Sequence, residues 1–282
     1  IIAELQVPIA PPTNARGHSP MIGAGTAALS ADGHISHPLL VKEPRLCLWR
    51  ALTDNDNGWI LDQRFVRSGY FVLDVKNRIV EPPSADSDHV VIHTTYVAAF
   101  GEEVVHTQTI TATEDGTLEF REHVKLPDGK HDLLRVGVVF ELAEGFETAR
   151  WVGLGPWENY PDRRQAALLG RWTASIDDLA TPYLVPQENG GRGQVVELEL
   201  SGSAGHAGIR ASTPLQVNVG RHSIDDLEAA DHWWDLPTSQ RSIVHLDIAH
   251  RGVGTGMLGP DTLPEFRVTH PAYEWSWDLR LL

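Results

Sequence analysis

Two glutamates in polar, glycine-rich segments are the first candidates for chemistry. Glu158 lies in the run from 151 to 164, and Glu188 lies in the run from 182 to 192. Two carboxyl groups held about 5 to 5.5 Å apart would suit retaining glycoside hydrolysis. The sequence does not supply that distance, and the alternative is that these carboxylates cap backbone groups or pair with an arginine such as Arg192.

The segment from 151 to 164 also places aromatic rings beside its carboxylates. Trp157 and Tyr160 offer apolar plates, and Asp162 adds a second carboxylate near Glu158. Sugars are bound by this combination, because a pyranose stacks its C–H face on a ring while its hydroxyls need fixed donors and acceptors. The alternative is a packed crossing between strands, in which the two following arginines neutralise the carboxylates.

A third polar segment, from 48 to 59, contains the run Asp54-Asn55-Asp56-Asn57-Gly58. Oxygen-bearing side chains at alternate positions resemble half of a calcium-binding loop. The other half is missing, since the twelfth position counted from Asp54 is Phe65 rather than a glutamate. A turn capped by its own Asp and Asn side chains is the interpretation that we favour over a metal site.

Other catalytic signatures are not found. The fourteen histidines show no His-Glu-x-x-His or similar ligand spacing. The glycine-rich run after His250 is like a dinucleotide fingerprint only in composition, because no helix is predicted after it. No Gly-x-Ser-x-Gly elbow is present.

Composition limits the partners. The chain has 282 residues, of which 23 are basic and 38 acidic, so the formal net charge is −15. That charge argues against nucleic acid and is compatible with a neutral ligand. A hydrophobic share of 41% supports a substantial core. The single cysteine, Cys47, excludes an intrachain disulfide, and no stretch reaches the roughly 18 apolar residues of a membrane-spanning helix.

Alternation of apolar and polar residues predicts β-strands along most of the chain. The clearest case is 273–281, where aromatic and leucine side chains occupy every second position. Further strands are predicted at 90–98, 103–113, 117–126, 133–142, 195–200, 215–219 and 242–248. Tight turns at Glu114-Asp115-Gly116 and Pro127-Asp128-Gly129 join the strands between 90 and 142, and we expect those four strands to form a meander.

Only one helix is predicted, at 224–230, where Ser223 and Asp226 have the spacing of a capping box. Regularly spaced strands without crossover helices predict an all-β fold, a large antiparallel sandwich. We expect one domain at 16–282. Residues 1–15, with a strand at 2–7, are expected to be a linker or the end of an earlier domain. Because the chain begins at Ile1, we expect a fragment or a processed product.

Four motifs, in this order, resemble the C-terminal domain (domain 5) of family 2 β-galactosidases, which is the small chain of split enzymes. The resemblance covers residues 22–282. The motifs are Leu48-Trp49-Arg50-Ala51-x-Thr53-Asp54-Asn55-Asp56; Gly153-Leu154-Gly155-Pro156-x-Glu158-Asn159-Tyr160-Pro161-Asp162-Arg163; Tyr183-x-x-Pro186-x-Glu188-Asn189-Gly190-x-Arg192; and His250-Arg251-Gly252-Val253-Gly254-Thr255 running to Gly259-Pro260-Asp261.

The resemblance implies a galactose-mutarotase-like supersandwich within a cytoplasmic β-galactosidase that hydrolyses terminal β-D-galactose residues by a retaining mechanism. The two catalytic glutamates and a magnesium ion of such an enzyme belong to a (β/α)₈ barrel, and this chain has no barrel pattern. We therefore expect no catalytic residue, metal or cofactor in these 282 residues. The expected partners are the remaining domains or large subunit, further copies in an oligomer, and the galactoside; a membrane is not expected.

The same resemblance implies that this domain contributes to the rim of the active site. Gly58 matches a glycine that lets the family's rim loop move, and glycine crosses φ/ψ regions without a side-chain penalty. Leu258 aligns with an aromatic sugar platform and offers apolar area without an aromatic face. Asp54, Asn55 and Asp56 belong to the same rim. The residues expected either to contact sugar or to support the loops are Glu158, Asn159, Tyr160, Glu188, Asn189 and Arg192.

A free-standing aldose epimerase or carbohydrate-binding module with the same sandwich is the alternative. An epimerase needs an acid and a base facing each other across a groove. His245 or His250 with Glu188 are the residues that could form such a pair, although neither pair matches an epimerase motif.

Overall fold

The strands form one large antiparallel sheet. The computed structural model describes residues 27–58, 61–84, 88–129, 131–254 and 261–282. Twelve strands, β3 to β14, belong to the sheet, and a small hairpin of β1 (Ala28–Leu29) and β2 (Ile35–Ser36) lies beside it. The predicted all-β antiparallel supersandwich is confirmed.

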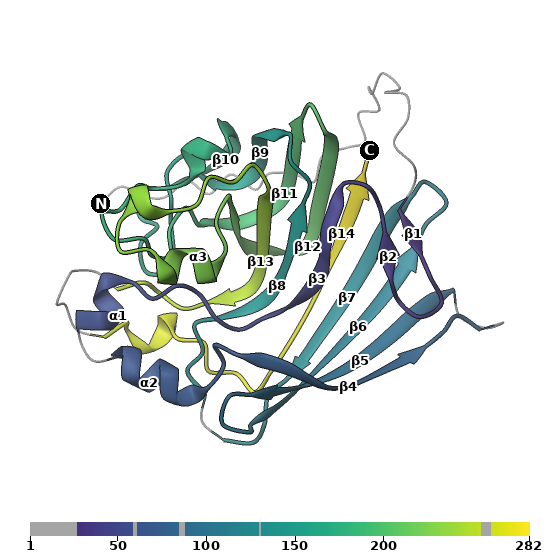
Figure 1. Ribbon diagram of the computed structural model, residues 1–282, viewed down its shortest axis with the longest axis horizontal. Coiled ribbons are helices and arrows are strands. Elements are labelled where there is room, and N and C mark those ends of the chain that lie inside the picture. Colours follow the sequence, from purple (N-terminus) through teal and green to yellow (C-terminus); the bar gives the residue numbers. More distant parts are fainter. Residues whose placement is uncertain (1–26, 59–60, 85–87, 130, 255–260) are drawn as a thin grey trace, which may run out of the picture.

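One half of the sheet has the simple alternation that the sequence predicts. Its strands β5, β6 and β7 bury every second side chain, because one face packs on the core and the other meets solvent. Figure 1 shows this half as a fan of long strands. In spatial order it comprises β14 (Ala272–Leu281), β7 (Thr117–Lys125), β6 (Glu103–Ala112), β5 (His89–Ala98) and the edge strand β4 (Leu73–Glu81).

The sheet branches at β12 (Gly205–Gly220), its longest strand. The first part of β12 pairs with β14 through Ala207–Ala211, and the last part pairs with β13 through Gln216–Gly220. Pro214 lies between these two parts. Because proline has no N–H to donate to a ladder, it fits the point where the strand changes partners.

The other half contains β10 (Leu168–Ser175), β9 (Phe146–Gly155), β11 (Arg192–Gly202), β13 (Ser242–His250), β8 (Arg135–Leu142) and β3 (Leu40–Cys47). Every residue of β8 is buried, because one face belongs to the main core and Val139 on the other packs with Cys47 and Ile243. The predicted four-strand meander is therefore wrong in its last strand. β8 follows β7 in the chain but pairs with β13 and β3 instead.

A tryptophan joins the two halves. Trp277 of β14 stacks on Phe120 of β7 at 4.2 Å between ring centroids, and Phe140 of β8 lies 5.7 Å away on nearly parallel planes. The Trp277 Nε1–H donates to Glu122 Oε1 at 3.0 Å, and Glu122 also binds His106 Nε2 at 2.8 Å. This polar group is completely enclosed, and its hydrogen bonds offset the cost of its burial.

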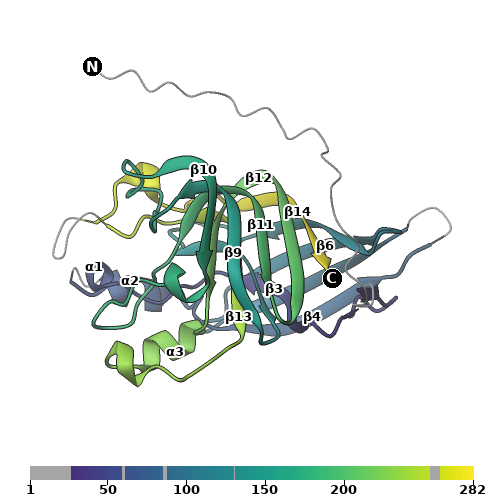
Figure 2. The same cartoon turned by 90° about the horizontal axis from the view of Figure 1, so that it is seen from above.

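Three short helices lie at one end of the molecule, as Figures 1 and 2 show: α1 (Asp54–Gly58), α2 (Leu61–Ser68) and α3 (Ile224–Ala229). The predicted cap of α3 is confirmed, because Ser223 Oγ accepts from the Asp226 N–H at 3.1 Å and the Asp226 carboxylate accepts from the Ser223 N–H at 2.8 Å. Helices α1 and α2 were not predicted, and a loop was expected where α1 lies. Single turns of 3₁₀-helix occur at Asp177–Leu179, Trp233–Asp235 and Pro264–Phe266.

Several strands escaped prediction because their side chains do not alternate. β4 is exposed at seven of its nine residues, and β10 is an edge strand with glycine and arginine inside it. β9 continues to Gly155, so the segment from 151 that was expected to be irregular begins as a strand. The expected domain boundary and the strand at 2–7 lie outside the described residues. No helix of the described residues is long and apolar enough to cross a membrane.

We expect Trp277→Ala to destabilise the fold by about 3–5 kcal/mol, because it opens a cavity between the two halves and removes a donor from Glu122. Urea unfolding followed by circular dichroism measures the change. Trp234→Ala is the matched control, since Trp234 is 57% exposed. Equal losses in both variants would contradict the role given to Trp277.

Candidate functional site

A buried ion pair lies at the centre of the four sequence motifs. Arg135 of β8 donates from Nη2 to Glu188 Oε2 at 3.1 Å and from Nη1 to His245 Nδ1 at 2.7 Å. The Arg135 and Glu188 side chains are 1% and 4% exposed. Tyr160 also donates its hydroxyl to Glu188, at 3.2 Å. Strand β8 and two of the motifs therefore meet at one carboxylate.

Electrostatics fix the protonation of this group. Burial acts to raise the pKa of Glu188, but Arg135 and His250 outweigh it and hold that pKa well below its usual range. Burial and Arg135 together lower the pKa of His245, and burial is the largest cause of the lowered pKa of His250. Glu188 is thus a fixed carboxylate, and both histidines are neutral at pH 7.

Asp247 is the least satisfied member of the cluster. It lies on β13 opposite Gly137 of β8, and its Oδ2 is 3.4 Å from the Arg135 Nε without hydrogen-bond geometry. Burial raises the pKa of Asp247 to about 7, against the attraction of Arg135 and with the repulsion of Glu188 added.

The first motif forms a capped helix rather than the expected Asx turn. Asp56 accepts from the Thr53 N–H at 2.8 Å, and the Thr53 hydroxyl accepts from the Asp56 N–H at 3.4 Å, so the two residues cap α1 reciprocally. Arg50, which is completely buried, donates to Asp56 at 2.8 Å. Burial raises the pKa of Asp56, but Arg50 and the hydrogen bonds outweigh burial and leave that pKa below its usual value.

Two side chains of α1 connect it to the other motifs. Asp54 and Gln187 exchange two hydrogen bonds, both at 3.1 Å: the Asp54 N–H donates to Oε1, and Gln187 Nε2 donates to the Asp54 carboxylate. Asn55 Nδ2 donates to the Val253 carbonyl at 2.8 Å. Gly58 is the last residue of α1, and Leu258 lies outside the described residues.

The second motif, at 153–163, binds the backbone of the fourth motif, which begins at His250. The Asp162 carboxylate accepts from the Val253 N–H at 3.0 Å and from the Gly254 N–H at 2.7 Å. Asn55 binds the Val253 carbonyl, so both polar groups of the Val253 backbone are held by side chains of other motifs. The alternative interpretation of this segment paired Asp162 with a neighbouring arginine, but the Asp162 carboxylate binds backbone N–H groups instead.

The third motif packs along the second. Asn159 donates its N–H to the Gly191 carbonyl at 2.8 Å and accepts from the Gly193 N–H at 2.8 Å. Asn189 accepts from the Thr181 N–H at 3.0 Å, which closes the turn before the motif. Arg192 donates to the carbonyls of Pro156, Gly190 and Gly191.

Glu158 is engaged by four donors. Its Oε2 accepts from the Thr181 hydroxyl at 2.9 Å and from the Gly190 N–H at 2.8 Å. Its Oε1 accepts from the Tyr183 hydroxyl and from Arg163. Glu158 and Glu188 are therefore both structural anchors in this chain, which agrees with the alternative interpretation of these carboxylates rather than with a hydrolytic pair.

The structure brings together the groups of the epimerase interpretation but not in a catalytic arrangement. His250 Nε2 lies 3.7 Å from Glu188 Oε1, and His245 touches Arg135. All of these groups are buried, and Glu188 is neutralised by a guanidinium. An acid and a base on opposite sides of an open groove are not formed by these residues.

Sequence reasoning missed two arginines that carry much of the network. Arg135 is one of two charged residues, with Glu141, in the otherwise apolar run 133–142, and a charge in such a run signals a buried partner. Arg251 belongs to the fourth motif and binds Asp132 at 2.8 Å and Asp261 at 2.6 Å. Their partners could not be found from spacing, because they lie up to 119 residues away.

Three tryptophans in or near the motifs, Trp49, Trp157 and Trp172, have different surroundings. Trp49 is buried and donates its Nε1–H to Glu228 at 2.7 Å. Trp172 packs against the core and donates to the Gly153 carbonyl at 3.2 Å. Trp157 is 77% exposed. Only Trp157 therefore presents a free ring face among these three.

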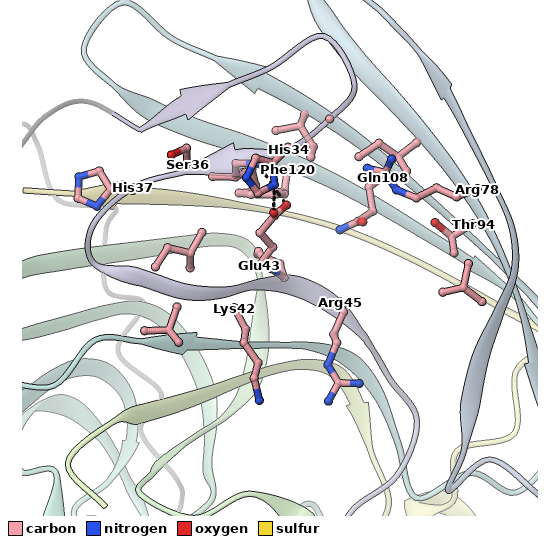
Figure 3. Close-up of a pocket in the computed structure, with 18 of the residues that line it drawn as sticks. His34, Ser36, His37, Lys42, Glu43, Arg45, Arg78, Thr94, Gln108 and Phe120 are labelled. Carbon is pink, nitrogen blue, oxygen red and sulfur yellow. Dashed lines mark hydrogen bonds and ion pairs between the residues drawn. The ribbon is translucent and has the colours of Figure 1, made fainter.

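A large hollow, of about 530 Å³, lies away from the motifs, between β3 and the β4–β7 half of the sheet. Thr94 and Gln108 of the sheet line it, and Figure 3 shows Glu43 directed toward His34 while Arg45 projects from the other side of β3. None of the predicted site residues lines this hollow. Within the ranges that the structure describes, no three His, Cys, Asp or Glu side chains gather as a group of metal ligands.

Comparison with known proteins identifies the family. The model of the β-galactosidase small chain matches residues 24–279. The chain belongs to the β-galactosidase small-chain family. A β-galactosidase from Arthrobacter sp. (strain B7) is 31% identical and aligns with 92% of this chain but 29% of its own length. A β-galactosidase from Vibrio cholerae is 30% identical over 86% of this chain and 24% of its own length. This small-chain domain thus spans less than a third of these relatives.

Among solved structures, a putative aldose 1-epimerase from Escherichia coli is similar to this small-chain domain with a TM-score of 0.40 and 12% identity, over 73% of this chain and 68% of that chain. The expected C-terminal, small-chain identity is confirmed by the family match.

Removing the charge of Glu188 should destabilise the small-chain domain strongly. In Glu188→Gln the buried Arg135 guanidinium loses its carboxylate, and a loss of about 3–5 kcal/mol in the free energy of unfolding is expected. Urea titration at pH 7 gives the value. Glu199→Gln, on the exposed side of β11, should stay within about 0.5 kcal/mol of the parent. A parent-like stability for Glu188→Gln would refute the central role of the pair.

Asp247 should make the free energy of unfolding of the domain fall as the pH rises. The pKa of Asp247 is about 7 in the folded chain against 3.8 as its reference value. Between these values the folded state keeps a proton that the unfolded chain has released, so the parent loses stability as the pH rises. Asp247→Asn does not titrate, and its stability relative to the parent should rise by about 3 kcal/mol from pH 4 to 7 and then level off.

Urea unfolding of both chains at four pH values between 4.5 and 7.5 measures this difference. The control is Asp74→Asn on the exposed strand β4, for which the difference should not change with pH. A difference for Asp247→Asn that is equally flat, or that falls as the pH rises, would show that Asp247 is ionised throughout.

Proposed function

We propose that this small-chain domain completes the active-site rim of a β-galactosidase whose catalytic glutamates lie elsewhere in the enzyme. The reaction is the hydrolysis of terminal, non-reducing β-D-galactose residues, with retention of configuration. One observation carries the proposal: the four family motifs meet in a single hydrogen-bonded network, in which Glu158 and Glu188, the candidate catalytic pair, are both already engaged.

The pKa, burial and hydrogen bonds of Glu158 and Glu188 favour a structural role over a catalytic one. A general acid needs a raised pKa and access to the leaving group, and a nucleophile needs an open face toward the sugar. The pKa of Glu188 is lowered and its side chain is buried. Glu158 is held by four donors. We therefore propose that the 282 residues alone do not hydrolyse galactosides.

The family's magnesium ion does not fit the described residues. Asp56 is neutralised by Arg50 and capped by Thr53, and Asp54 is held by Gln187, so the acidic run of the first motif does not offer a free set of oxygen ligands. We assign the magnesium ion to the catalytic barrel of the remaining polypeptide.

The residues of the network position the rim. Asn55 and Asp162 hold the Val253 and Gly254 backbone from two motifs, and thereby fix the point from which residues 255–260 depart. Gly58 is the last residue of α1, the helix that also carries Asn55. We propose that Gly58 and Leu258 reach the sugar, with Leu258 giving apolar contact to the leaving group, and that Asp54, Asn55 and Asp56 support them.

The partners and location follow from the same proposal. The domain associates with the rest of a β-galactosidase, either in one polypeptide or as a separate subunit, and the assembled enzyme is an oligomer. The single cysteine, which is buried and unpaired, is compatible with the reducing cytoplasm.

Reconstitution with a barrel-containing partner tests the rim assignment. The purified chain should not cleave a chromogenic β-galactoside, and mixing it with the complementary fragment of a β-galactosidase should restore turnover. Asp162→Asn keeps only one carbonyl oxygen for the two N–H groups of Val253 and Gly254. We expect it to lower kcat/KM of the reconstituted enzyme about tenfold or more, a loss of at least about 1.4 kcal/mol.

The affinity between the two fragments, measured by titration, should be unchanged in Asp162→Asn. Asp178→Asn, an exposed substitution outside the motifs, serves as the control and should leave kcat/KM unchanged. Turnover by the small-chain domain alone that disappears in Glu158→Gln or Glu188→Gln would overturn the proposal. Full activity of the Asp162→Asn enzyme would overturn the role of the network in positioning the rim.

A further inference from the structure

An exposed tryptophan on a rigid turn has no role in the network described above. Trp157 follows the end of β9 and is 77% exposed. Its backbone carbonyl accepts from Asn159 Nδ2 at 3.0 Å, and the side chain of Asn159 also accepts from the Gly193 N–H at 2.8 Å. The turn that carries the indole is therefore fixed to the start of β11. The apolar area of an indole that is exposed to water contributes favourable free energy only when a binding partner covers it.

The ring borders a hollow of about 470 Å³, which is within the size range of small-ligand sites, about 300–1,000 Å³. Trp157, Asp162, Arg164 and Gln165 contribute to its walls. Among the described residues, no group forms a hydrogen bond or ion pair with the side chains of Arg164 and Gln165. The hollow thus combines one exposed aromatic ring with polar groups that have bonds left to make.

We propose that this hollow is a binding site for a neutral oligosaccharide, with one sugar ring stacked on Trp157 and its hydroxyls bound by Arg164 and Gln165. An aromatic plate suits the C–H face of a pyranose, and the guanidinium and carboxamide suit its hydroxyls. Two acidic and two basic side chains line the hollow, Glu158 and Asp162 with Arg163 and Arg164, so its charges balance and we assign a neutral ligand. The galactan-type chain follows from the proposed function.

The position of Asp162 relates this site to the rim. Asp162 is a wall residue of the hollow, and its carboxylate holds the N–H groups of Val253 and Gly254. The inference deepens the proposed function, on which it rests, because it adds a substrate class: galactosides long enough to be held by the small-chain domain as well as cleaved by the enzyme.

Two further exposed tryptophans in the described part of the chain offer a matched comparison. Trp233 and Trp234 are 51% and 57% exposed, but His232 stacks on Trp234 at 4.5 Å with nearly parallel planes, and the two indoles contact edge to face at 5.6 Å. One face of Trp234 is therefore already covered. Trp157 makes no ring contact with any other described residue.

Titration calorimetry of the whole chain with β-1,4-galactotetraose, and with lactose as a shorter probe, tests the site. The parent should bind the tetrasaccharide more tightly than lactose. Trp157→Ala should weaken tetrasaccharide binding at least tenfold, Trp157→Phe should retain part of the affinity, and Trp234→Ala should bind as the parent does. Arg164→Met with Gln165→Ala should weaken binding while the ring remains. Circular dichroism establishes that each variant is folded.

Three results would overturn the site: no binding by the folded parent chain, equal binding by the parent and Trp157→Ala, or an equal loss in Trp234→Ala. The result of the binding experiment can be distinguished from the result of the reconstitution experiment that tests the proposed function. Failure of reconstitution with intact tetrasaccharide binding removes the rim assignment and leaves the Trp157 site. Successful reconstitution with no tetrasaccharide binding does the reverse.

Discussion

The buried pair of Arg135 and Glu188 is the constraint on which the arrangement of the loops depends. A guanidinium inside a strand that is buried on both faces is tolerated only with a carboxylate in contact, because an unpaired charge there costs several kcal/mol. Glu188 supplies that carboxylate from a segment more than fifty residues later. The third motif must therefore lie on β8, and Tyr160, which shares the same carboxylate, brings the second motif with it. The first and fourth motifs attach to these through Gln187 and Asp162.

This constraint agrees with the supporting role that we propose for the acidic, aromatic and histidine-rich cluster. In a hydrolytic site, two carboxyl groups are kept in different protonation states and face the substrate. Here Glu188 and Asp247 also differ in protonation, but both are buried and neither faces a substrate; Glu188 is ionised against Arg135, and Asp56 against Arg50. Such pairs resist displacement, because moving one partner leaves the other desolvated and unpaired. Rigid support suits segments that must meet a substrate bound by another part of an enzyme.

The elements that could be predicted from the sequence are those with one face in the core and the other in solvent, or with a local capping motif. Strands β7 and β14 have one face in the core and one in solvent, so their side chains alternate, and α3 begins with a complete capping box. Strand β8 is covered on both faces, so its pairing with β13 rather than β7 left no periodic signal. In the site, the motifs identified which segments matter. The contacts between them join residues up to 198 positions apart, such as Asn55 and Val253, and spacing along the chain does not encode them.

Asn159 connects the buried network with the exposed surface. Its backbone and side chain bind Gly191 and Gly193, and its amide group also fixes the Trp157 carbonyl. A displacement of the indole support would therefore disturb the start of β11 and the segment that carries Glu188. The ring consequently lies on a surface whose conformation is set before any ligand arrives, and a ligand that stacks there loses little free energy to ordering the protein. The buried ion pairs and hydrogen bonds that make these segments rigid therefore also preorganise the surface around Trp157.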